Sequence, residues 1–274
     1  MSKINKHDTR IINTPDDVID AYCCADAESM TGIETEICFF DPEQSDLPIM
    51  TPAQNAEVME KTVAQHPPGS FNHEPASDLL EANSAPAKFE DLHTVFDDIH
   101  AKLKTLRTEA AKLGLKRSPF QDLPHITAAG LLSSIVDIER YQAFFNPPRA
   151  DMMDIAAYFT AAKSTQVSIS YKNYDHMLAN VRRLYLLAPF LFMLTDNSSG
   201  FNEAKPFAGH HGMHHRASLK ARGGFPPYIF TAREGEDYIR DHINHAMHNP
   251  MYVYYDENNI LQHCLLYTSP SPRD

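Results

Sequence analysis

Long hydrophobic stretches and positive charge are both scarce in this sequence. The longest apolar run, 184–194, contains Pro189 and is shorter than the roughly 18 residues that a membrane span needs, so we interpret it as a core segment. Lys and Arg number 24 against 36 Asp and Glu, a net charge of −12. A surface of this sign repels nucleic acid and anionic lipid. We expect neither as a partner, and we expect any bound phosphate to need a cation beside it.

Cysteine is scarce as well, and no Cys-x-x-Cys pair is present. Cys23 and Cys24 are adjacent, Cys38 falls in a predicted strand and Cys264 lies near the C-terminus, a pattern that indicates reduced thiols. The N-terminal residues are polar and charged, without the apolar segment of a secretory signal or the Arg and Ser bias of a transit peptide. The sequence therefore predicts a cytoplasmic protein.

Several common catalytic motifs are also missing. The chain contains no P-loop, no G-x-G-x-x-G, no H-E-x-x-H, no G-x-S-x-G and no EF-hand loop. Its 274 residues fit one or two domains at roughly 150 residues each. Function must then be sought in less standard patterns.

The spacing of apolar residues predicts four helices. They span 51–65, 89–113, a segment from Met177 that is interrupted or kinked at Pro189, and 234–248. Thr51 and Pro52 form an N-terminal helix signal, and Gly114 is a C-terminal one.

Alternation of polar and apolar residues predicts three strands that each present a polar face. Glu34 and Glu36 share one face of a strand over 32–40. The other two strands, 77–83 and 165–171, carry Ser77, Glu81 and Asn83, and Gln166, Ser168 and Ser170. Such faces are either solvated or line a wet cavity. The long helices between the strands suggest that the sheet is covered on its other side.

Glu34 and Glu36 form the first candidate site. Carboxylates two residues apart on a strand start about 7 Å apart at the backbone, close enough to hold adjacent hard cations. An exposed strand face with scattered charge explains the same pattern, and Glu81 alone is typical of a surface residue. The residues by themselves leave both interpretations open.

Histidines offer a hypothesis from another class, a divalent-metal binding or hydrolytic protein. The residues concerned are His210, His211, His214 and His215, with His242, His245 and His248. Gly209 and Gly212 argue against a regular helix at the first group, and no Cys or acidic partner completes a ligand set. His242, His245 and His248 have the spacing of surface residues near a helix end. For the segment 210–215, we favour a polar loop over a zinc site.

Five segments in order resemble the glutamate–cysteine ligases of the plant-like and proteobacterial group. They are GIETE (32–36), LEANSAP (80–86), TQVSI (165–169), TDNSSG (195–200) and HR (215–216), and the resemblance covers about 30–260. It implies an α+β, glutamine-synthetase-like fold, in which an antiparallel sheet curves into a funnel with helices outside. It also implies joining of the γ-carboxylate of L-glutamate to the amine of L-cysteine through a γ-glutamyl phosphate. ATP and Mg²⁺ would be required, and the reaction is the first step of glutathione synthesis.

The resemblance further implies roles for individual residues. Glu34, Glu36 and Glu81 match metal ligands, and their carboxylates are expected to converge on one concave face. The matched substrate-binding positions are Gln166, Ser168, Asn197 and Arg216, with Arg216 also catalytic as a clamp on a carboxylate or phosphoryl group. Ser168 departs from the family, where many relatives carry Asn or His. A ligase of the same fold that uses a different acceptor amine stays an alternative, because no residue identifies a pocket for the thiol of cysteine.

The C-terminal residues 264–274, CLLYTSPSPRD, switch to a Ser- and Pro-rich composition and resemble translated sequencing adapter. An ordinary disordered terminus is the alternative. We expect 1–263 to be a catalytic domain that is incomplete at its C-terminus, and 264–274 to be a non-native or disordered tail. Such a chain is expected to be poorly soluble or inactive by itself.

Overall fold

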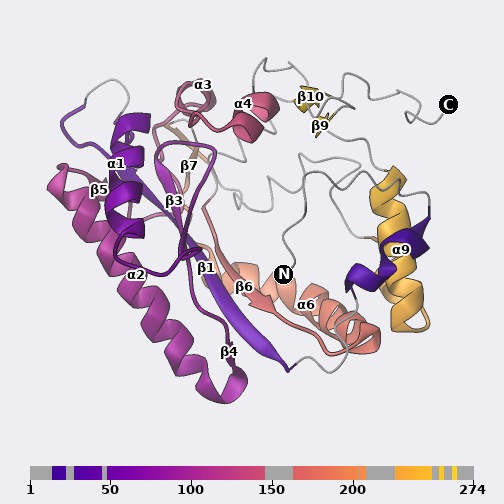
Figure 1. Ribbon diagram of the computed structural model, residues 1–274. Coiled ribbons are helices and arrows are strands. Elements are labelled where there is room, and N and C mark those ends of the chain that lie inside the picture. The colour runs from indigo at the N-terminus through magenta and orange to yellow at the C-terminus, as the bar shows by residue number, and fades with distance from the viewer. Residues whose placement is uncertain are drawn as a thin grey trace. The chain divides into compact units, whose positions relative to one another are not determined.

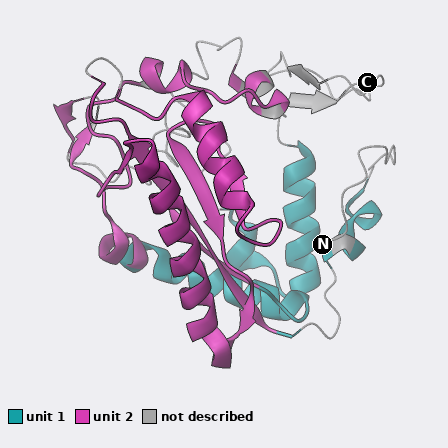
Figure 2. Ribbon diagram, turned by 60° about the vertical axis from the view of Figure 1, so that its left-hand side comes forward, with its two compact units in different colours: residues 1–28, 170–190, 225–249 teal, residues 29–169, 191–224, 250–274 magenta. Residues whose placement is uncertain are grey.

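The computed structural model describes residues 14–22, 28–44, 48–145, 163–202, 204–207, 226–248, 253–255 and 261–263. The chain forms two compact units, which Figure 2 shows in different colours. Unit 1 comprises 1–28, 170–190 and 225–249, and unit 2 comprises 29–169, 191–224 and 250–274. Each unit has a hydrophobic core of its own.

Strands and helices are mixed in unit 2, and the described part of unit 1 is helical. The strands are β1 (Met30–Phe40), β2 (Phe71–His73), β3 (Leu79–Asn83), β4 (Ala87–Lys88), β5 (Lys116–Arg117), β6 (Thr165–Ile169), β7 (Phe201–Asn202), β8 (Lys205–Pro206), β9 (Val253–Tyr255) and β10 (Leu261–His263). The helices of unit 2 are α1 (Pro52–Val63), η3 (Phe89–Asp91), α2 (Leu92–Lys112), α3 (Ala128–Leu132) and α4 (Glu139–Phe145). Unit 1 holds η1 (Pro15–Asp17), η2 (Ile19–Tyr22), most of α6 (Tyr174–Thr195), α8 (Tyr228–Thr231) and α9 (Gly235–His248). The predicted α+β class is confirmed.

An antiparallel sheet, six-stranded over the described residues, organises unit 2 (Figure 1). The long strand β1 pairs with β3 along one edge and with β6 along the other. β2 extends the sheet beyond β3, and the short strands β4 and β5 pair with opposite ends of β1. The three strands predicted to have polar faces are therefore neighbours in one sheet.

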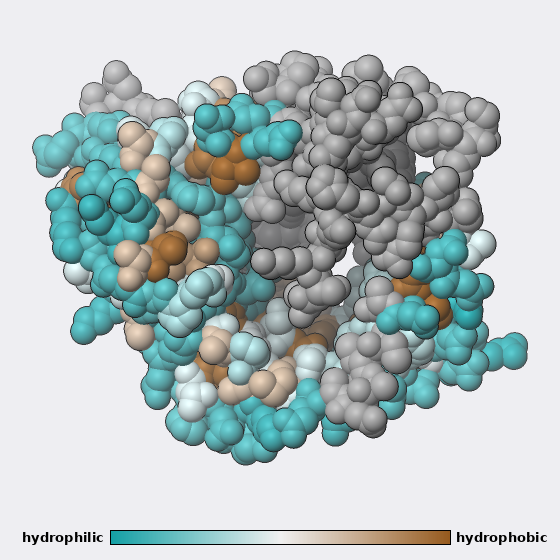
Figure 3. Space-filling model, viewed as in Figure 1, coloured by the Kyte–Doolittle hydropathy of each residue, from teal (hydrophilic) through white to brown (hydrophobic). Residues whose placement is uncertain are grey.

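Helices α1 and α2 cover the apolar face of β1, β2 and β3 (Figure 1). The apolar residues of β6, Val167 and Ile169, are 59% and 47% exposed. Ile33, Ile37 and Phe39 recur at every second residue of β1 and join one core cluster with Val58 of α1 and Leu106 of α2. Figure 3 shows that the outer sides of the two helices are mostly hydrophilic. Because side chains alternate along a strand, the residues between these apolar ones point away from the helices.

The ends of α1 and α2 follow the sequence signals. The Thr51 hydroxyl accepts a hydrogen bond from the backbone N–H of Gln54 at 3.2 Å, and Pro52 occupies the first helical position. After α2, Gly114 has a φ of +78°, the left-handed conformation in which glycine commonly terminates a helix. Both predicted helices are confirmed to within a few residues at their ends.

The helix α6 differs from the sequence-based expectation. It continues through Pro189 to Thr195 without a break. The proline removes one hydrogen bond and strains the preceding turn, while the leucines on both sides are good helix formers. Large side chains of the run 184–194 are exposed, among them Phe190 at 64% and Met193 at 82%. The prediction of a core segment is therefore wrong for the described structure. The helix buries instead the face that carries Leu178.

Among the helices of the described residues, α6 is long and apolar enough to cross a membrane. Core helices of soluble proteins meet the same criterion of length and composition, so the criterion alone assigns no membrane. In unit 1, Arg182 of α6 donates hydrogen bonds of 2.7 Å to the backbone oxygens of Ile229 and Ala232. These bonds join α6 to α8.

Aromatic residues fill the core of unit 1, and α9 confirms the helix predicted over 234–248. His242 of α9 lies among Tyr22, Tyr228 and Tyr238, and its ring is stacked on Tyr238 with centroids 6.0 Å apart. Burial, and secondarily His245, lower the pKa of His242, which favours the neutral ring. The structure thus places His242 in aromatic packing, which argues against the histidine-metal hypothesis for this helix.

Candidate functional site

A row of polar side chains crosses three strands of the sheet. Glu36 of β1 lies directly opposite Glu81 of β3, and Glu81 lies opposite Asn72 of β2. Residues paired in this way point to the same face, with Cβ atoms about 4.5–5.5 Å apart. The row places two of the predicted metal ligands side by side.

A second row lies next to the first, two residues away along β1. Glu34 is flanked by Asn83 of β3 and Gln166 of β6. Ser168 comes next on the same side of β6, opposite Gly32. The polar positions of the three strands therefore share one face, as their alternation predicts.

Three carboxylates meet on this face. One oxygen atom from each of Glu36, Glu74 and Glu81 lies within 4.8 Å of the other two. Glu36 and Glu81 come from facing strands, whereas Glu74 follows directly after β2. Glu34 lies outside this group, in the neighbouring row.

Glu74 is the member of the group that sequence reasoning does not find. It stands between the end of β2 and Pro75, two residues after Asn72. The same spacing places Glu34 and Glu36 on one face of β1. A strand of three residues is too short, however, for a period of two to be recognised in a sequence.

Hydrogen bonds hold the carboxylate of Glu81. Its Oε1 accepts from Nδ2 of Asn72 at 2.8 Å and from Nδ2 of Asn83 at 3.0 Å. Glu81 is 7% exposed, so these amides also replace water around the charge. The carboxylate is thereby held in one orientation.

The carboxylate of Glu36 is held by β6 and the residue before it. Oε2 accepts from the backbone N–H of Ser164 at 2.7 Å and from its hydroxyl at 3.2 Å, and Oε1 accepts from Nε2 of Gln166 at 3.3 Å. Burial is the largest influence on the pKa of Glu36 and raises it, and the charge of Glu81 raises it further. These effects outweigh the hydrogen bonds of Ser164 and the charge of Lys163, which lower the pKa. Ionised Glu36 therefore benefits from a nearby cation.

An ion pair is buried in the same unit. Nζ of Lys163 lies 3.1 Å from Oδ2 of Asp78. Burial, the largest influence, lowers the pKa of Lys163, but Asp78, Cys38 and Glu36 together raise it above its usual value. Lys163 is therefore charged at neutral pH.

Cys38, on the polar side of β1, is a free and buried thiol. Burial raises its pKa to about 11, so it is protonated at neutral pH and is a poor metal ligand. The prediction of reduced thiols is confirmed for this cysteine. The other three, Cys23, Cys24 and Cys264, lie outside the described residues.

Asn197 is engaged in backbone contacts. Its Nδ2 donates to the carbonyl oxygen of Pro119 at 3.0 Å, and its own carbonyl oxygen accepts from the N–H of Gln121 at 3.2 Å. These bonds tie the segment after α6 to the loop after β5, and a contact with substrate stays a prediction. Arg216 and the residues His210, His211, His214 and His215 lie outside the described residues, so their roles stay predictions too.

The carboxylate group is chemically suited to a hard divalent cation. Three like charges at this separation repel one another unless a proton or a cation compensates them. Carboxylate oxygens are the ligands that Mg²⁺ and Mn²⁺ prefer. The amide hydrogen bonds from Asn72, Asn83 and Gln166 orient the carboxylates, as supporting residues do around bound metals. The residues therefore fit such an ion.

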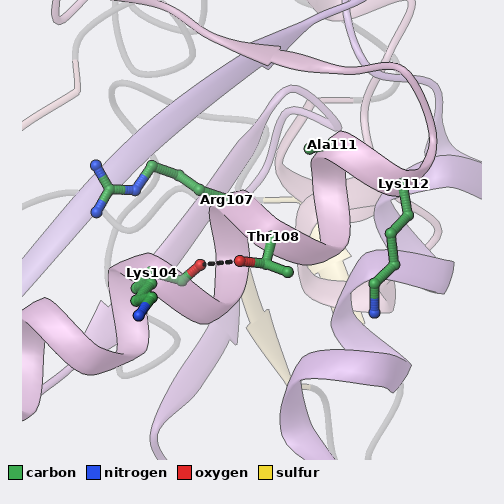
Figure 4. Close-up of a pocket in the computed structure, with 5 residues that line it drawn as sticks. All are labelled: Lys104, Arg107, Thr108, Ala111 and Lys112. Atoms are coloured by element: carbon green, nitrogen blue, oxygen red, sulfur yellow. Dashed lines mark hydrogen bonds between the residues drawn. The ribbon is translucent and has the colours of Figure 1, made fainter.

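A shallow concavity lies elsewhere in unit 2, along one side of α2. Its lining residues are Lys104, Arg107, Thr108, Ala111 and Lys112. Figure 4 shows the three cationic side chains pointing in different directions, while the Thr108 hydroxyl donates to the carbonyl oxygen of Lys104 at 2.9 Å. Because all five come from one helix and the cations do not converge, we interpret the concavity as a solvated helix face.

Comparison with known proteins identifies the family. A family model described as glutamate-cysteine ligase family 2 (GCS2) matches residues 30–263. A comparison with curated proteins gave no match. The matched region contains both polar rows and the three-carboxylate group. The chain therefore belongs to the glutamate-cysteine ligase family 2.

Proposed function

We propose that this protein joins the γ-carboxylate of L-glutamate to the amine of L-cysteine, using ATP and Mg²⁺, in the cytoplasm. Family membership implies a ligase of the glutamate–cysteine type, and thus a place in glutathione biosynthesis. The observation that carries the finer proposal is the group of Glu36, Glu74 and Glu81. An acidic protein without a P-loop needs such a cation site to hold phosphate groups.

Glu36, Glu74 and Glu81 would hold the metal, and Glu34 in the adjacent row would serve a neighbouring ion. Bound Mg²⁺ supplies positive charge that neutralises the phosphate oxygens. The residues around the group keep its carboxylates oriented, because Asn72 and the other amides already donate to them. We also propose that the sheet forms one wall of a glutamine-synthetase-like funnel, with this face toward the interior.

The proposed reaction has two steps. An oxygen of the glutamate γ-carboxylate attacks the γ-phosphorus of ATP, and ADP leaves. The amine nitrogen of cysteine then attacks the γ-carbonyl carbon and loses a proton, and phosphate leaves. Gln166 and Ser168, which are exposed on the polar face of β6, are proposed to contact these substrates. Arg216 is proposed to clamp the carboxylate or the transferred phosphoryl group.

The direct test incubates the purified full-length protein with glutamate, cysteine, ATP and Mg²⁺. We expect γ-glutamylcysteine, detected by mass spectrometry, to form in equal amount with ADP, and both to disappear when Mg²⁺ is chelated. A product with another amine but not with cysteine would identify a different ligase of the same fold. Failure to release ADP with any amine tested would contradict the proposal.

Metal binding should depend on pH through Glu36. Because its pKa lies above the ordinary glutamate value, protons compete with the metal at a higher pH than usual, and affinity should fall by about tenfold per pH unit below that pKa. In the metal-free protein, folding stability depends on pH in the opposite direction to metal affinity. The stability from this raised pKa is present below about pH 4.5, the ordinary glutamate value, and is lost as the pH rises through the pKa of the folded state.

Titration with Mn²⁺, followed by electron paramagnetic resonance from pH values below the ordinary glutamate pKa up to neutral pH, measures this dependence. Glu36→Gln should remove most of it, whereas Glu57→Gln, a change at an exposed site on α1, should leave it intact. Equal pH dependence in the wild-type protein and in Glu36→Gln would show that Glu36 does not compete with protons for the ion.

A further inference from the structure

The ion pair between Lys163 and Asp78 is almost completely removed from solvent. The two side chains are 2% and 0% exposed, and Nζ lies 3.1 Å from Oδ2. Neither oxygen of Asp78 accepts a well-formed hydrogen bond from the described residues. Attraction to the charge of Lys163 therefore offsets the loss of water around this carboxylate. The free-energy cost of desolvating a buried ion pair often exceeds the attraction between its charges. A contribution to stability therefore does not by itself explain why this pair is buried.

The places of the two residues in the chain point to another role. Lys163 directly precedes Ser164, whose N–H and hydroxyl both donate to Glu36 and whose carbonyl oxygen accepts the Glu36 N–H at 2.9 Å. Asp78 directly precedes β3, three residues before Glu81, and its carbonyl oxygen accepts the N–H of Phe39 at 2.8 Å. The pair therefore connects the segment that holds Glu36 to the strand that carries Glu81.

We propose that Lys163 and Asp78 are positioning residues that set the distance between the carboxylates of Glu36 on β1 and Glu81 on β3. This inference rests on the proposed function for the identity of the ligand, a hard divalent cation. Mg²⁺ requires near-octahedral ligands at about 2.0–2.1 Å, so a small change in carboxylate spacing weakens binding. A buried pair with one geometry keeps that spacing before the ion arrives.

The double variant Lys163→Met/Asp78→Leu tests the inference. It removes one charge of each sign, so the net charge near the carboxylates is unchanged, and apolar replacements of similar size commonly preserve or raise stability. We expect the melting temperature to stay level or rise while the Kd for Mn²⁺, measured by electron paramagnetic resonance, weakens by about tenfold, as with other residues that orient metal ligands. A wild-type Kd in a folded double variant would overturn the inference.

A second variant covers the case in which the double variant does not fold. Asp78→Glu keeps both charges but lengthens the connection by one methylene, so the Kd for Mn²⁺ should again weaken, and an unchanged Kd would overturn the inference. Glu81→Gln separates the two proposals. If Glu81→Gln binds Mn²⁺ as tightly as the wild-type protein, the metal site itself is wrong. If it binds weakly while the pair variants bind normally, only the positioning role is wrong.

Discussion

In the full-length protein, replacing Glu36 with glutamine is expected to lower ATP-dependent product formation by more than about 100-fold, above the usual effect of residues that merely orient a metal ligand. Glutamine has the same size and can still accept the hydrogen bond from Ser164, but it lacks the charge that a hard cation requires. The fold should persist. Because burial disfavours the charge of Glu36, the metal-free variant should be at least as stable as the wild-type protein.

Steady-state ADP release and the melting temperature, measured on the same preparation, test this expectation. Glu57→Gln is the matched control, because it makes the same chemical change at an exposed site on α1. Activity within a few-fold of wild type in Glu36→Gln would mean that the three-carboxylate group is a solvated polar surface. Loss of the folded state would mean that Glu36 is needed for packing.

Replacing Gly235 with alanine should destabilise unit 1 by about 3 kcal/mol, the upper end of the usual cost of overpacking. A Cβ atom at this position would lie 2.0 Å from the carbonyl carbon of Tyr174 and 2.2 Å from the nitrogen of Asp175. Both are backbone atoms at the start of α6, so no side-chain rotation relieves the clash. The N–H of Gly235 also donates to Oδ1 of Asp175 at 2.7 Å, and separating the helices would lose that bond.

Thermal and urea unfolding measure the effect, which should appear as a melting temperature lower by several degrees. Gly32→Ala is the control, since its new Cβ would meet Ser84 and Pro86 only at 3.8 and 3.9 Å, ordinary contact distances. Equal stability of the two variants would contradict the close approach of α9 to α6 within unit 1.

Features that depend on neighbouring residues are readable in the sequence. Thr51 and Pro52 predict the start of α1, and the alternation of Glu34 and Glu36 with isoleucines predicts the polar side of β1. These predictions succeed because capping bonds and side-chain alternation are set within a few residues. Hydrophobicity was a poorer guide for the run 184–194, because exposure depends on what packs against a helix and not on its composition.

The three-carboxylate group of Glu36, Glu74 and Glu81 shows what sequence patterns do not predict. Alternation alone predicts that Glu34, Glu36 and Glu81 line polar faces, yet it leaves open which carboxylates become neighbours. That choice follows from strand register, which sets Glu81 opposite Glu36 and Asn83 opposite Glu34. A shift of one residue would have turned the whole of β3 over.

By itself, the sequence determined the α+β class, the main helices and the polar faces of β1, β3 and β6, together with a resemblance that the family match confirms. Tertiary structure alone brought Glu74 to Glu36 and Glu81, and paired Lys163 with Asp78. The physical reason is separation along the chain. Propensity and periodicity act between near neighbours, whereas contacts between residues far apart in sequence arise only when the strands have paired and the core has closed around them.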